Sequence, residues 1–360
     1  MDSAKSLFKI SGVYVARGET REINLKVSES YLSTGIQIPV TIIRGKIDGP
    51  VAFVTAAIHG DEINGTDIVR RLIFDVDHEK LRGTLIAIPV VNIPGFLSQS
   101  RYLPYHRDLN RFFPGKQKGN NAERIAWRLF QEVMSQCDFG IDIHTASNGR
   151  SNLPHVRGDM GNATVRRLAR AFGATILVDQ PGLKGTLRRE ATDAGVPTIL
   201  FEAGETGKFS NRVSVAGLRG VLNLLTEMGM WTATPGKNTR PPFQVIVKAS
   251  DWIRAEKGGI LDLAVRPGDL IYKDDLIGSI LNPFGKTVTR MRAPTTGIVI
   301  GVTTAPLTIP GTGVVHVARL KKALALVERK LAHGKRKIKK TKSRRKSKLK
   351  RARAAKGKTI

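Results

Sequence analysis

The sequence has a single cysteine, few aromatic residues and no long hydrophobic run. Because Cys137 is the only cysteine among 360 residues, the chain forms no internal disulfide and has no cysteine-rich metal site. No stretch reaches the roughly 18–20 uninterrupted apolar residues that a membrane-spanning helix needs. The opening segment, MDSAKSLFKISG, lacks the apolar centre of a secretory signal peptide. These absences argue against a disulfide-rich secreted scaffold and predict a cytoplasmic protein with no membrane span.

Acidic residues are also scarce, and the imbalance is concentrated at one end of the chain. The 59 Lys and Arg residues outnumber 30 Asp and Glu residues, which gives a formal net charge of +29. Residues 321–360 hold 19 bases and one acid, a net of +18, whereas the first 320 residues hold 40 bases and 29 acids, a net of +11. The basic end is therefore a poor guide to the chemistry of the body, whose 41% apolar content suffices for a full core.

Hydrophobic periodicity predicts an α/β fold for the first two thirds of the chain. Alternating residues over 7–48 indicate strands with hairpin turns. Four apolar runs are typical of buried strands, at 50–60, 83–93, 137–145 and 196–205. Between or after these runs lie four stretches whose apolar residues have helical spacing, at 63–75, 121–134, 165–172 and 215–230. This alternation predicts a mixed central sheet with helices on both faces, which we assign to a catalytic domain over residues 1–234.

Beyond a segment rich in Pro and Gly at 232–242, the pattern changes to short strands without a convincing helix. The stretches GGILDLAVRPGDLIYKDDLIGSIL and MRAPTTGIVIGV resemble the two halves of biotinyl/lipoyl-carrier domains. The attachment signature is missing from NPFGKTVTRMR, so we interpret Lys286 as an ordinary hairpin lysine. We predict a small all-β, barrel-like domain over 241–318 that acts as a structural wall or lid. A basic helix and a disordered basic tail are expected over 319–360.

Two histidines that directly follow buried strands suggest a metal site. His59 lies in AAIHGDEING, three residues before Glu62, and His144 lies in FGIDIHTAS. The carboxyl ends of strands are where α/β proteins place their sites, and two His with one carboxylate suit a catalytic zinc ion. Asp142 shares a strand face with His144 and can hold its second ring nitrogen. The alternatives are a hydrogen-bonded core histidine at position 59 and a capping role for Asp142.

An arginine-rich loop predicts an anion-binding surface near these residues. The loop RDLNRFFPG at 107–115 contains Arg107, Asn110 and Arg111, and Arg101 lies just upstream. Guanidinium groups held on a structured loop suit bidentate recognition of a carboxylate. A solvated surface loop is the alternative, although the interleaved apolar residues favour an ordered one.

A carboxylate at the end of the fourth apolar run is a candidate general base. Glu202 follows VPTILF, and Glu205 lies further into the loop as a weaker alternative. A carboxylate at the mouth of a buried strand can accept a proton from a metal-activated water.

Taken together, the motifs HGDE, SRY…RDLNRFFPG, DIHTAS and FEAGE resemble the succinylglutamate desuccinylase/aspartoacylase family of the zinc carboxypeptidase-like superfamily, over roughly residues 10–318. The resemblance implies a zinc carboxypeptidase-like fold and one Zn²⁺ per chain. It also implies roles for individual residues: His59, Glu62 and His144 as zinc ligands; Glu202 as general base and acid; Arg101 as stabiliser of the oxyanion; Asn110 and Arg111 as carboxylate ligands; and Arg107 or Arg188 as further substrate-binding cations.

The resemblance further implies hydrolysis of a linear amide in a small acidic N-acyl substrate, with the acyl group left open. Two other functions remain open beside this one. The first is a catalytically silent protein that retains the zinc site. The second is a nucleic-acid or polyanion-binding protein that acts through residues 334–360. Such binding would be nonspecific and dependent on salt, and no aromatic residue interrupts the basic run to stack on bases.

Overall fold

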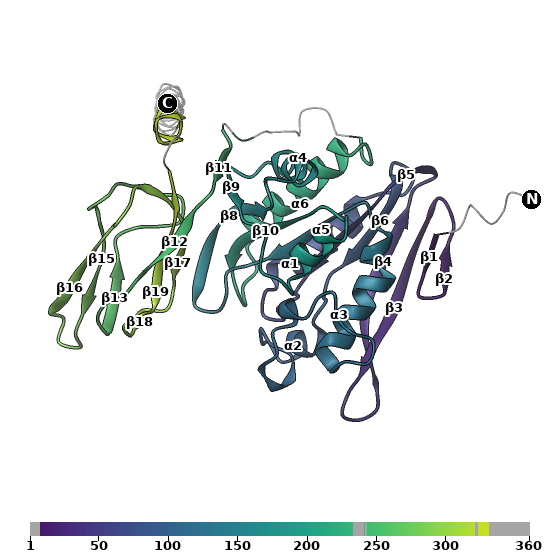
Figure 1. The fold of residues 1–360 in the computed structure, drawn as a ribbon, viewed down its shortest axis with the longest axis horizontal. Helices are drawn as coiled ribbons and strands as arrows, with labels where there is room; N and C mark the ends of the chain where they lie inside the picture. The colour runs from purple at the N-terminus through teal and green to yellow at the C-terminus, as the bar shows by residue number, and fades with distance from the viewer. Residues whose placement is uncertain (1–7, 233–240, 242, 321–322, 331–360) are drawn as a thin grey trace, which may run out of the picture. The chain divides into compact units, whose positions relative to one another are not determined.

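The computed structural model describes residues 8–232, 241, 243–320 and 323–330. Its centre is a 13-stranded mixed sheet with the main strand order β12-β19-β17-β8-β10-β7-β5-β6-β4-β3, with β9, β11 and β14 joined to it (Figure 1). Its strands from the first two thirds of the chain are β3 (Glu19–Glu29), β4 (Gly35–Arg44), β5 (Ile47–Ala56), β6 (Arg82–Ile88), β7 (Phe139–His144), β8 (Arg150–Gly158), β9 (Ile176–Asp179) and β10 (Thr198–Glu205). The remaining strands of this sheet are β11 (Val245–Val247), β12 (Ser250–Arg254), β14 (Leu270–Ile271), β17 (Gly297–Thr303) and β19 (Gly313–Arg319).

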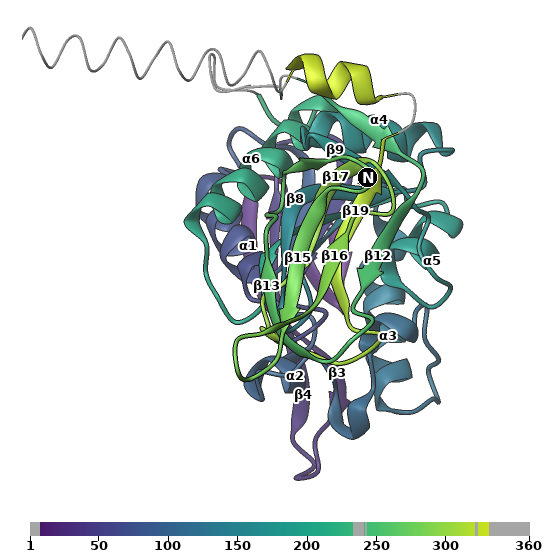
Figure 2. The same ribbon diagram turned by 90° about the vertical axis from the view of Figure 1, so that its left-hand side faces the viewer.

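Helices cover both faces of this sheet, as the end-on view in Figure 2 shows. The helices are α1 (Asn64–Asp75), α2 (Ile93–Leu97), α3 (Asn121–Glu132), α4 (Ala163–Phe172), α5 (Leu187–Asp193) and α6 (Asn211–Glu227), with 3-10 turns η2 (Pro104–His106), η3 (Leu109–Arg111) and η4 (Met134–Gln136). Residues of α1, α4 and α6 share one hydrophobic core, and residues of α3 and α5 share a second. In β5, Val54 belongs to the first core and Phe53 to the second, because successive side chains of a strand point to opposite faces.

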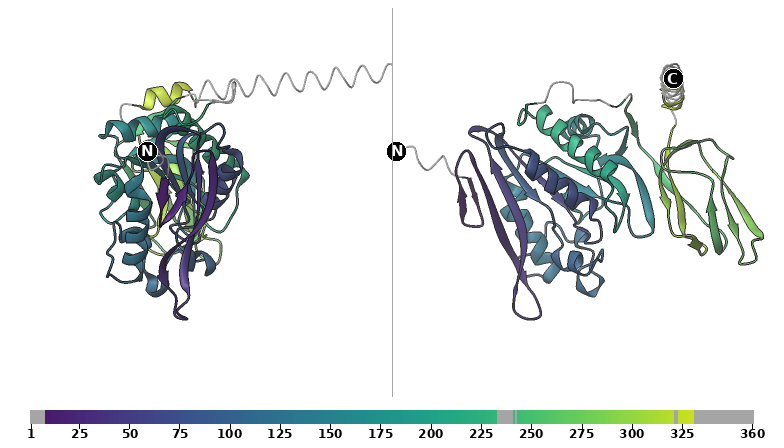
Figure 3. Two further views of the ribbon diagram at one scale, coloured as in Figure 1. Left: turned by 90° about the vertical axis from the view of Figure 1, so that its right-hand side faces the viewer. Right: turned by 180° about the vertical axis from the view of Figure 1, so that it is seen from behind.

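The predicted fold class is confirmed. The four predicted buried strands correspond to β5, β6, β7 and β10, and the four predicted helices to α1, α3, α4 and α6. Strand β5 runs parallel to β6 and β7, whereas β4 pairs antiparallel with β6 and β8 antiparallel with β10, so the sheet is mixed. Seen from behind in Figure 3, the long β3–β4 hairpin, drawn in purple, lies at one edge of this sheet.

Strands β8 and β9 and helix α5 were not among the predicted elements. The segment that forms β8, RSNLPHVRG, mixes polar and apolar residues without strict alternation. Several of its polar side chains line the cavity described below, and these polar positions interrupt the apolar pattern of a buried strand.

The β-rich region after residue 243 has its own hydrophobic core, which includes Leu261, Ile280 and Val315. A second sheet, β16-β15-β13-β18, contains β13 (Gly259–Leu263), β15 (Leu276–Leu281), β16 (Thr287–Arg292) and β18 (Leu307–Thr308). Strand β17 also pairs with β8, so this region extends the central sheet within a compact unit that ends at Arg319. The proposed domain boundary between residues 234 and 241 remains a prediction.

At the chain's two ends the structure describes less. A two-stranded antiparallel sheet, β1 (Phe8–Ile10) and β2 (Val13–Val15), precedes the central sheet. Residues 324–330 are helical and belong to a second unit that starts at Leu320. The predicted tail at 334–360 lies outside the described residues. Within the described part of the chain, no helix has the length and apolar character needed to cross a membrane.

Candidate active site

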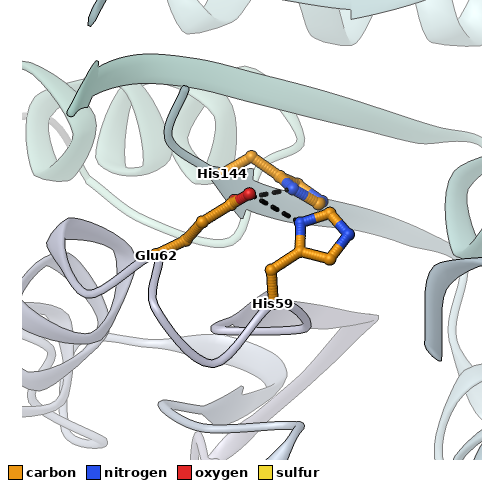
Figure 4. Close-up of side chains that lie close together, drawn as sticks. All are labelled: His59, Glu62 and His144. Carbon is orange, nitrogen blue, oxygen red and sulfur yellow. Dashed lines mark hydrogen bonds and ion pairs between the residues drawn. The ribbon is translucent and has the colours of Figure 1, made fainter. Parts of the chain in front are cut away.

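The candidate metal ligands meet where parallel strands of the central sheet end. His59 follows β5, Glu62 lies in the turn before α1, and His144 is the last residue of β7. Figure 4 shows the Glu62 carboxylate reaching between the two imidazole rings. Glu202, on β10, stands opposite His144 in the parallel register, so its side chain enters the same edge of the sheet.

The three side chains form a tight and buried cluster. The Glu62 carboxylate lies 2.6 Å from His59 Nδ1 and 2.9 Å from His144 Nδ1. Candidate ligand atoms of the three residues all lie within 4.8 Å of one another, and each residue is at most 4% exposed. Two imidazole nitrogens and one carboxylate form the donor set of many catalytic zinc sites, with room for a further ligand.

Each imidazole presents Nδ1 to Glu62 and Nε2 to a different carboxylate. His144 Nε2 lies 2.8 Å from Asp142 Oδ2, and His59 Nε2 lies 3.2 Å from Asp108 Oδ1. Asp142 is itself oriented, because the Thr55 hydroxyl donates to its Oδ1 at 2.8 Å. A carboxylate on the outer nitrogen fixes the ring and leaves the inner nitrogen available to a metal ion.

The electrostatics of the cluster favour a cation at its centre. Burial lowers the pKa of His59 and His144, but the neighbouring carboxylates outweigh it, and both pKa values are raised overall. Burial raises the pKa of Glu62, but the two imidazoles outweigh it and lower that pKa overall. The buried carboxylate thus requires positive charge beside it, which protons on the imidazoles or a divalent ion can supply. The residues present therefore fit a zinc ion.

Arg101 lies at the edge of the same cluster. Its Nη1 is 3.1 Å from His59 Nδ1 and 3.3 Å from Glu62 Oε1, and its Nη2 donates to Asp108 Oδ2 at 2.9 Å. Burial lowers the pKa of Arg101, but Glu62 and Asp108 outweigh it and raise that pKa overall. A guanidinium held in this way can face a carbonyl oxygen that gains negative charge.

A polar cavity of about 270 Å³ opens onto the cluster. Asn110 and Arg111, both in η3, lie on its lining together with Arg101 and Glu202. The Asn110 side-chain oxygen accepts from the Leu187 N–H at 2.8 Å, and Arg111 Nη1 donates to the Asn110 carbonyl at 2.6 Å. The loop thereby holds an amide and a guanidinium side by side in the cavity.

Glu202 is oriented by two residues of β8. Asn152 Nδ2 donates to Glu202 Oε1 at 2.9 Å, and Arg157 Nε lies 3.7 Å from Oε2. The Glu202 side chain is 13% exposed, so one side of its carboxylate remains accessible from the cavity.

Two of the sequence-predicted cations do not lie on the cavity lining. Arg107 lies in a separate groove, where its guanidinium faces the Tyr105 ring at 5.8 Å. Arg188 is buried, donates to the carbonyls of Gln180 and Pro181 at 3.1 and 3.3 Å, and has its pKa lowered to about 10 by burial. Substrate-binding roles for both remain predictions.

Other residues of the site were not singled out from the sequence. The position of Asp108 beside Asn110 and Arg111 was a usable signal, since a loop that serves the site can also supply the partner of a ligand. Trp252 and His316 also line the cavity, from β12 and β19. No local sequence pattern connects Trp252 or His316 with the two histidine motifs.

Fold and site together define an α/β protein with a two-histidine, one-carboxylate centre at the carboxyl ends of its parallel strands. Residues 48–228 match the model of the succinylglutamate desuccinylase/aspartoacylase catalytic domain. The chain belongs to this family of amide-bond hydrolases, which confirms the resemblance found in the sequence. This match ends before the β-rich region that contributes Trp252 and His316.

Individual relatives agree with this assignment. The chain is 26% identical over 269 residues to an N-alpha-acetyl-L-2,4-diaminobutyric acid deacetylase of Halomonas elongata. The aligned residues cover 72% of this chain and 78% of the relative. The product-bound ectoine utilization protein EutE (DoeB) of Ruegeria pomeroyi superposes with a TM-score of 0.77 at 23% identity, over 88% of this chain and 100% of that one. A succinylglutamate desuccinylase/aspartoacylase of Rhodobacter sphaeroides gives the same TM-score, identity and coverage. The two superpositions support the fold, including its β-rich region.

Proposed function

We propose that the chain is a zinc-dependent amidohydrolase that removes an acyl group from a small acidic N-acyl amino acid or related amide. The observation that carries the proposal is the His59–Glu62–His144 cluster, whose two rings turn Nδ1 inward and are each held at Nε2 by a carboxylate. Membership of a family of amide-bond hydrolases supports the reaction class, and the deacetylase relative supports an N-acyl amino acid as substrate.

In this proposal His59, Glu62 and His144 hold the zinc ion. When bound, zinc supplies a Lewis acid that polarises a carbonyl and lowers the pKa of a water molecule. Asn110 and Arg111 bind a substrate carboxylate, which places the amide over the cluster. Arg101 donates to the carbonyl oxygen as negative charge develops there.

Glu202 moves the proton. Its carboxylate, held by Asn152 and Arg157, accepts a proton from the attacking water and later donates it to the nitrogen of the leaving amine. The products are a carboxylic acid and a free amine, so the proton balance closes on this one residue.

The test combines metal analysis with a panel of N-acyl amino acids. We expect about one zinc per chain and turnover that a chelator abolishes and added zinc restores. Glu202→Gln should retain zinc and lose at least on the order of 10²-fold in kcat, because the amide cannot accept the proton. Glu205→Gln is the matched control: it lies on the same strand, bonded to Lys208 and Thr304 rather than facing the cavity.

Two results would contradict the proposal. The first is wild-type protein that binds no zinc, which contradicts the metal site. The second is a Glu202→Gln variant that turns over at the wild-type rate, which contradicts the role of Glu202 as general base. Zinc binding without turnover of any N-acyl compound would favour the catalytically silent alternative.

A further inference from the structure

The turn at residues 103–107 contains two adjacent residues in a backbone conformation that favours glycine. Tyr105 has a φ of +63° and His106 a φ of +54°. No other neighbouring pair of non-glycine residues in the described part of the chain shares this left-handed conformation. The Cβ atom of an L residue crowds the backbone there, so both positions are strained. Burial does not explain these side chains, because both are exposed, Tyr105 at 76%.

Ring contacts and one backbone bridge hold the turn in this conformation. The Leu103 N–H donates to the Arg107 carbonyl at 2.9 Å and closes the turn. The Arg107 guanidinium lies 5.8 Å from the centre of the Tyr105 ring. His106 packs edge-on against Tyr102, with 5.6 Å between ring centroids. Strained residues persist where such contacts over-determine the backbone, and they concentrate at functional sites.

Both ends of the turn lead directly into the candidate metal cluster. Arg101 stands two residues before the bridge and Asp108 one residue after it. Arg101 Nη2 donates to Asp108 Oδ2 at 2.9 Å, and Asp108 Oδ1 lies 3.2 Å from His59 Nε2. Arg101 Nη1 lies 3.3 Å from Glu62 Oε1. The geometry of the turn therefore sets where this guanidinium and this carboxylate stand beside the cluster.

Asn110 and Arg111 have a separate support on the side of α5. The Asn110 side-chain oxygen accepts from the Leu187 N–H at 2.8 Å. The Phe113 N–H donates to the Gly185 carbonyl at 3.0 Å. A looser turn at 103–107 should therefore leave the proposed carboxylate-binding pair in place and affect the two residues that flank the turn.

We propose that Tyr105 and His106 are positioning residues, which hold Arg101 and Asp108 beside the candidate zinc ligands by keeping the turn in its strained conformation. The inference rests on the proposed function, because Arg101 acts there on the developing oxyanion. Glycine at either strained position would relieve the strain but allow the turn several conformations. The guanidinium would then face the carbonyl oxygen for less of the time, although the fold would be no less stable.

The test places glycine at each strained position. For Tyr105→Gly and for His106→Gly, we expect kcat to fall on the order of tenfold, because the oxyanion donor is no longer fixed, with KM changed by less than about twofold. Tm should not fall, because glycine adopts the left-handed conformation without the strain of a side chain. Tyr105→Phe keeps the ring that faces Arg107 and should retain kcat within about twofold of the wild type.

Asp274→Gly is the matched control for relief of strain. Asp274 has a φ of +69°, is exposed and lies in the β-rich region outside the cavity lining. This variant should change Tm in the same direction as Tyr105→Gly and keep the wild-type kcat. An equal fall of kcat in the two variants would contradict the role assigned to the turn.

Two readouts do not depend on turnover. Hydrogen exchange at the Leu103 amide, which the bridge protects, should be faster in Tyr105→Gly than in the wild type. Zinc affinity should fall in the same variant, because the Asp108 carboxylate orients the His59 ring. If the wild type turns over no N-acyl compound while both readouts change as expected, the proposed function fails and the inference stands.

Three results would overturn the inference. The first is Tyr105→Gly protein with wild-type kcat, Leu103 exchange and zinc affinity. The second is a kcat in Tyr105→Phe as low as in Tyr105→Gly, which would show that the ring does not hold the turn. The third is a fall of Tm in Tyr105→Gly and His106→Gly that accompanies the loss of kcat, which would indicate a general structural role.

Discussion

At the scale of single residues, each imidazole of the cluster has a specific carboxylate partner at its outer nitrogen, Nε2, as well as at its inner nitrogen, Nδ1. Asp142 reaches His144 from the same strand, two residues away, whereas Asp108 reaches His59 across 49 residues of chain. Both carboxylates add negative charge behind a candidate ligand ring and hold its orientation. They also oppose the penalty that burial places on a charged centre.

Neutralising either outer carboxylate should weaken zinc binding. We expect Asp108→Asn and Asp142→Asn each to reduce zinc affinity by about 10–100-fold, because an amide can still meet Nε2 but brings no charge. Competition with a chromogenic chelator measures the change. Asp61→Asn is the comparison, since Asp61 neighbours Glu62 in sequence and makes no hydrogen bond to either imidazole among the bonds of the described residues. Wild-type zinc affinity in both test variants would show that the outer carboxylates are dispensable.

At the scale of elements, the site depends on loops pressed against one another as much as on strands. The turn before α5 packs closely on η3. A Cβ added at Gly185 in this turn would stand 2.4 Å from the Arg111 carbonyl oxygen, so only glycine fits there without displacement. Its φ of +84° is also one that L residues with a side chain rarely adopt. This glycine thus allows the close approach that places Arg111 in the cavity.

Gly185→Ala should displace Arg111 and raise KM for an acidic substrate by on the order of tenfold. Gly195→Ala provides the matched control, with a φ of +88° and no atom within 4 Å of the added Cβ. Both variants carry the cost of a left-handed alanine, roughly 1–2 kcal/mol, so both should lower Tm. Only Gly185→Ala should alter KM, and an equal rise in both variants would contradict the role assigned to the contact.

The β12–β19 pair predicts a pH dependence of stability. Burial is the main cause that lowers the pKa of His316 from 6.5 to about 3 in the folded chain. As pH falls below 6.5, the unfolded chain therefore binds a proton at this histidine, whereas the folded chain does not. Its contribution is therefore present above that pH and is lost on acidification, by about 2 kcal/mol between pH 7 and pH 5. Urea unfolding of wild type and His316→Gln should show the variant's deficit shrinking by about that amount. A deficit that is the same at both pH values would be the opposite result.

At the scale of the whole molecule, the densest positive charge and the candidate active site lie in different parts of the chain. The candidate site lies in the compact unit that ends at Arg319. Residues 334–360 carry 15 Lys and Arg and no Asp or Glu. A block of this kind binds polyanions by releasing their counterions, with little dependence on sequence.

Removal of residues 334–360 should therefore separate the two properties. We expect the truncated chain to elute from heparin and bind duplex DNA at much lower salt than the full chain, with kcat/KM changed by less than about twofold. The dependence of DNA affinity on salt should also become shallower, since fewer phosphates are neutralised. A large loss of turnover on truncation would instead tie the basic segment to catalysis.

The sequence by itself determined those features that local pattern controls. Apolar runs located β5, β6, β7 and β10, and the strand period placed Asp142 on the same face as His144. The order of its motifs was enough to identify the family. Each of these predictions depends only on residues that are close together in the sequence or on short sequence motifs.

Only the tertiary structure decided which distant side chains share the cavity. Asp108 became the partner of His59, β8 brought Asn152 to Glu202, and β12 brought Trp252 to Arg150. The order of strands in the sheet and the packing of loops determine these contacts. The hydrophobic periodicity of a single segment indicates neither of them. The same reason explains why Arg107 and Arg188, equally plausible as cations in the sequence, lie off the cavity lining.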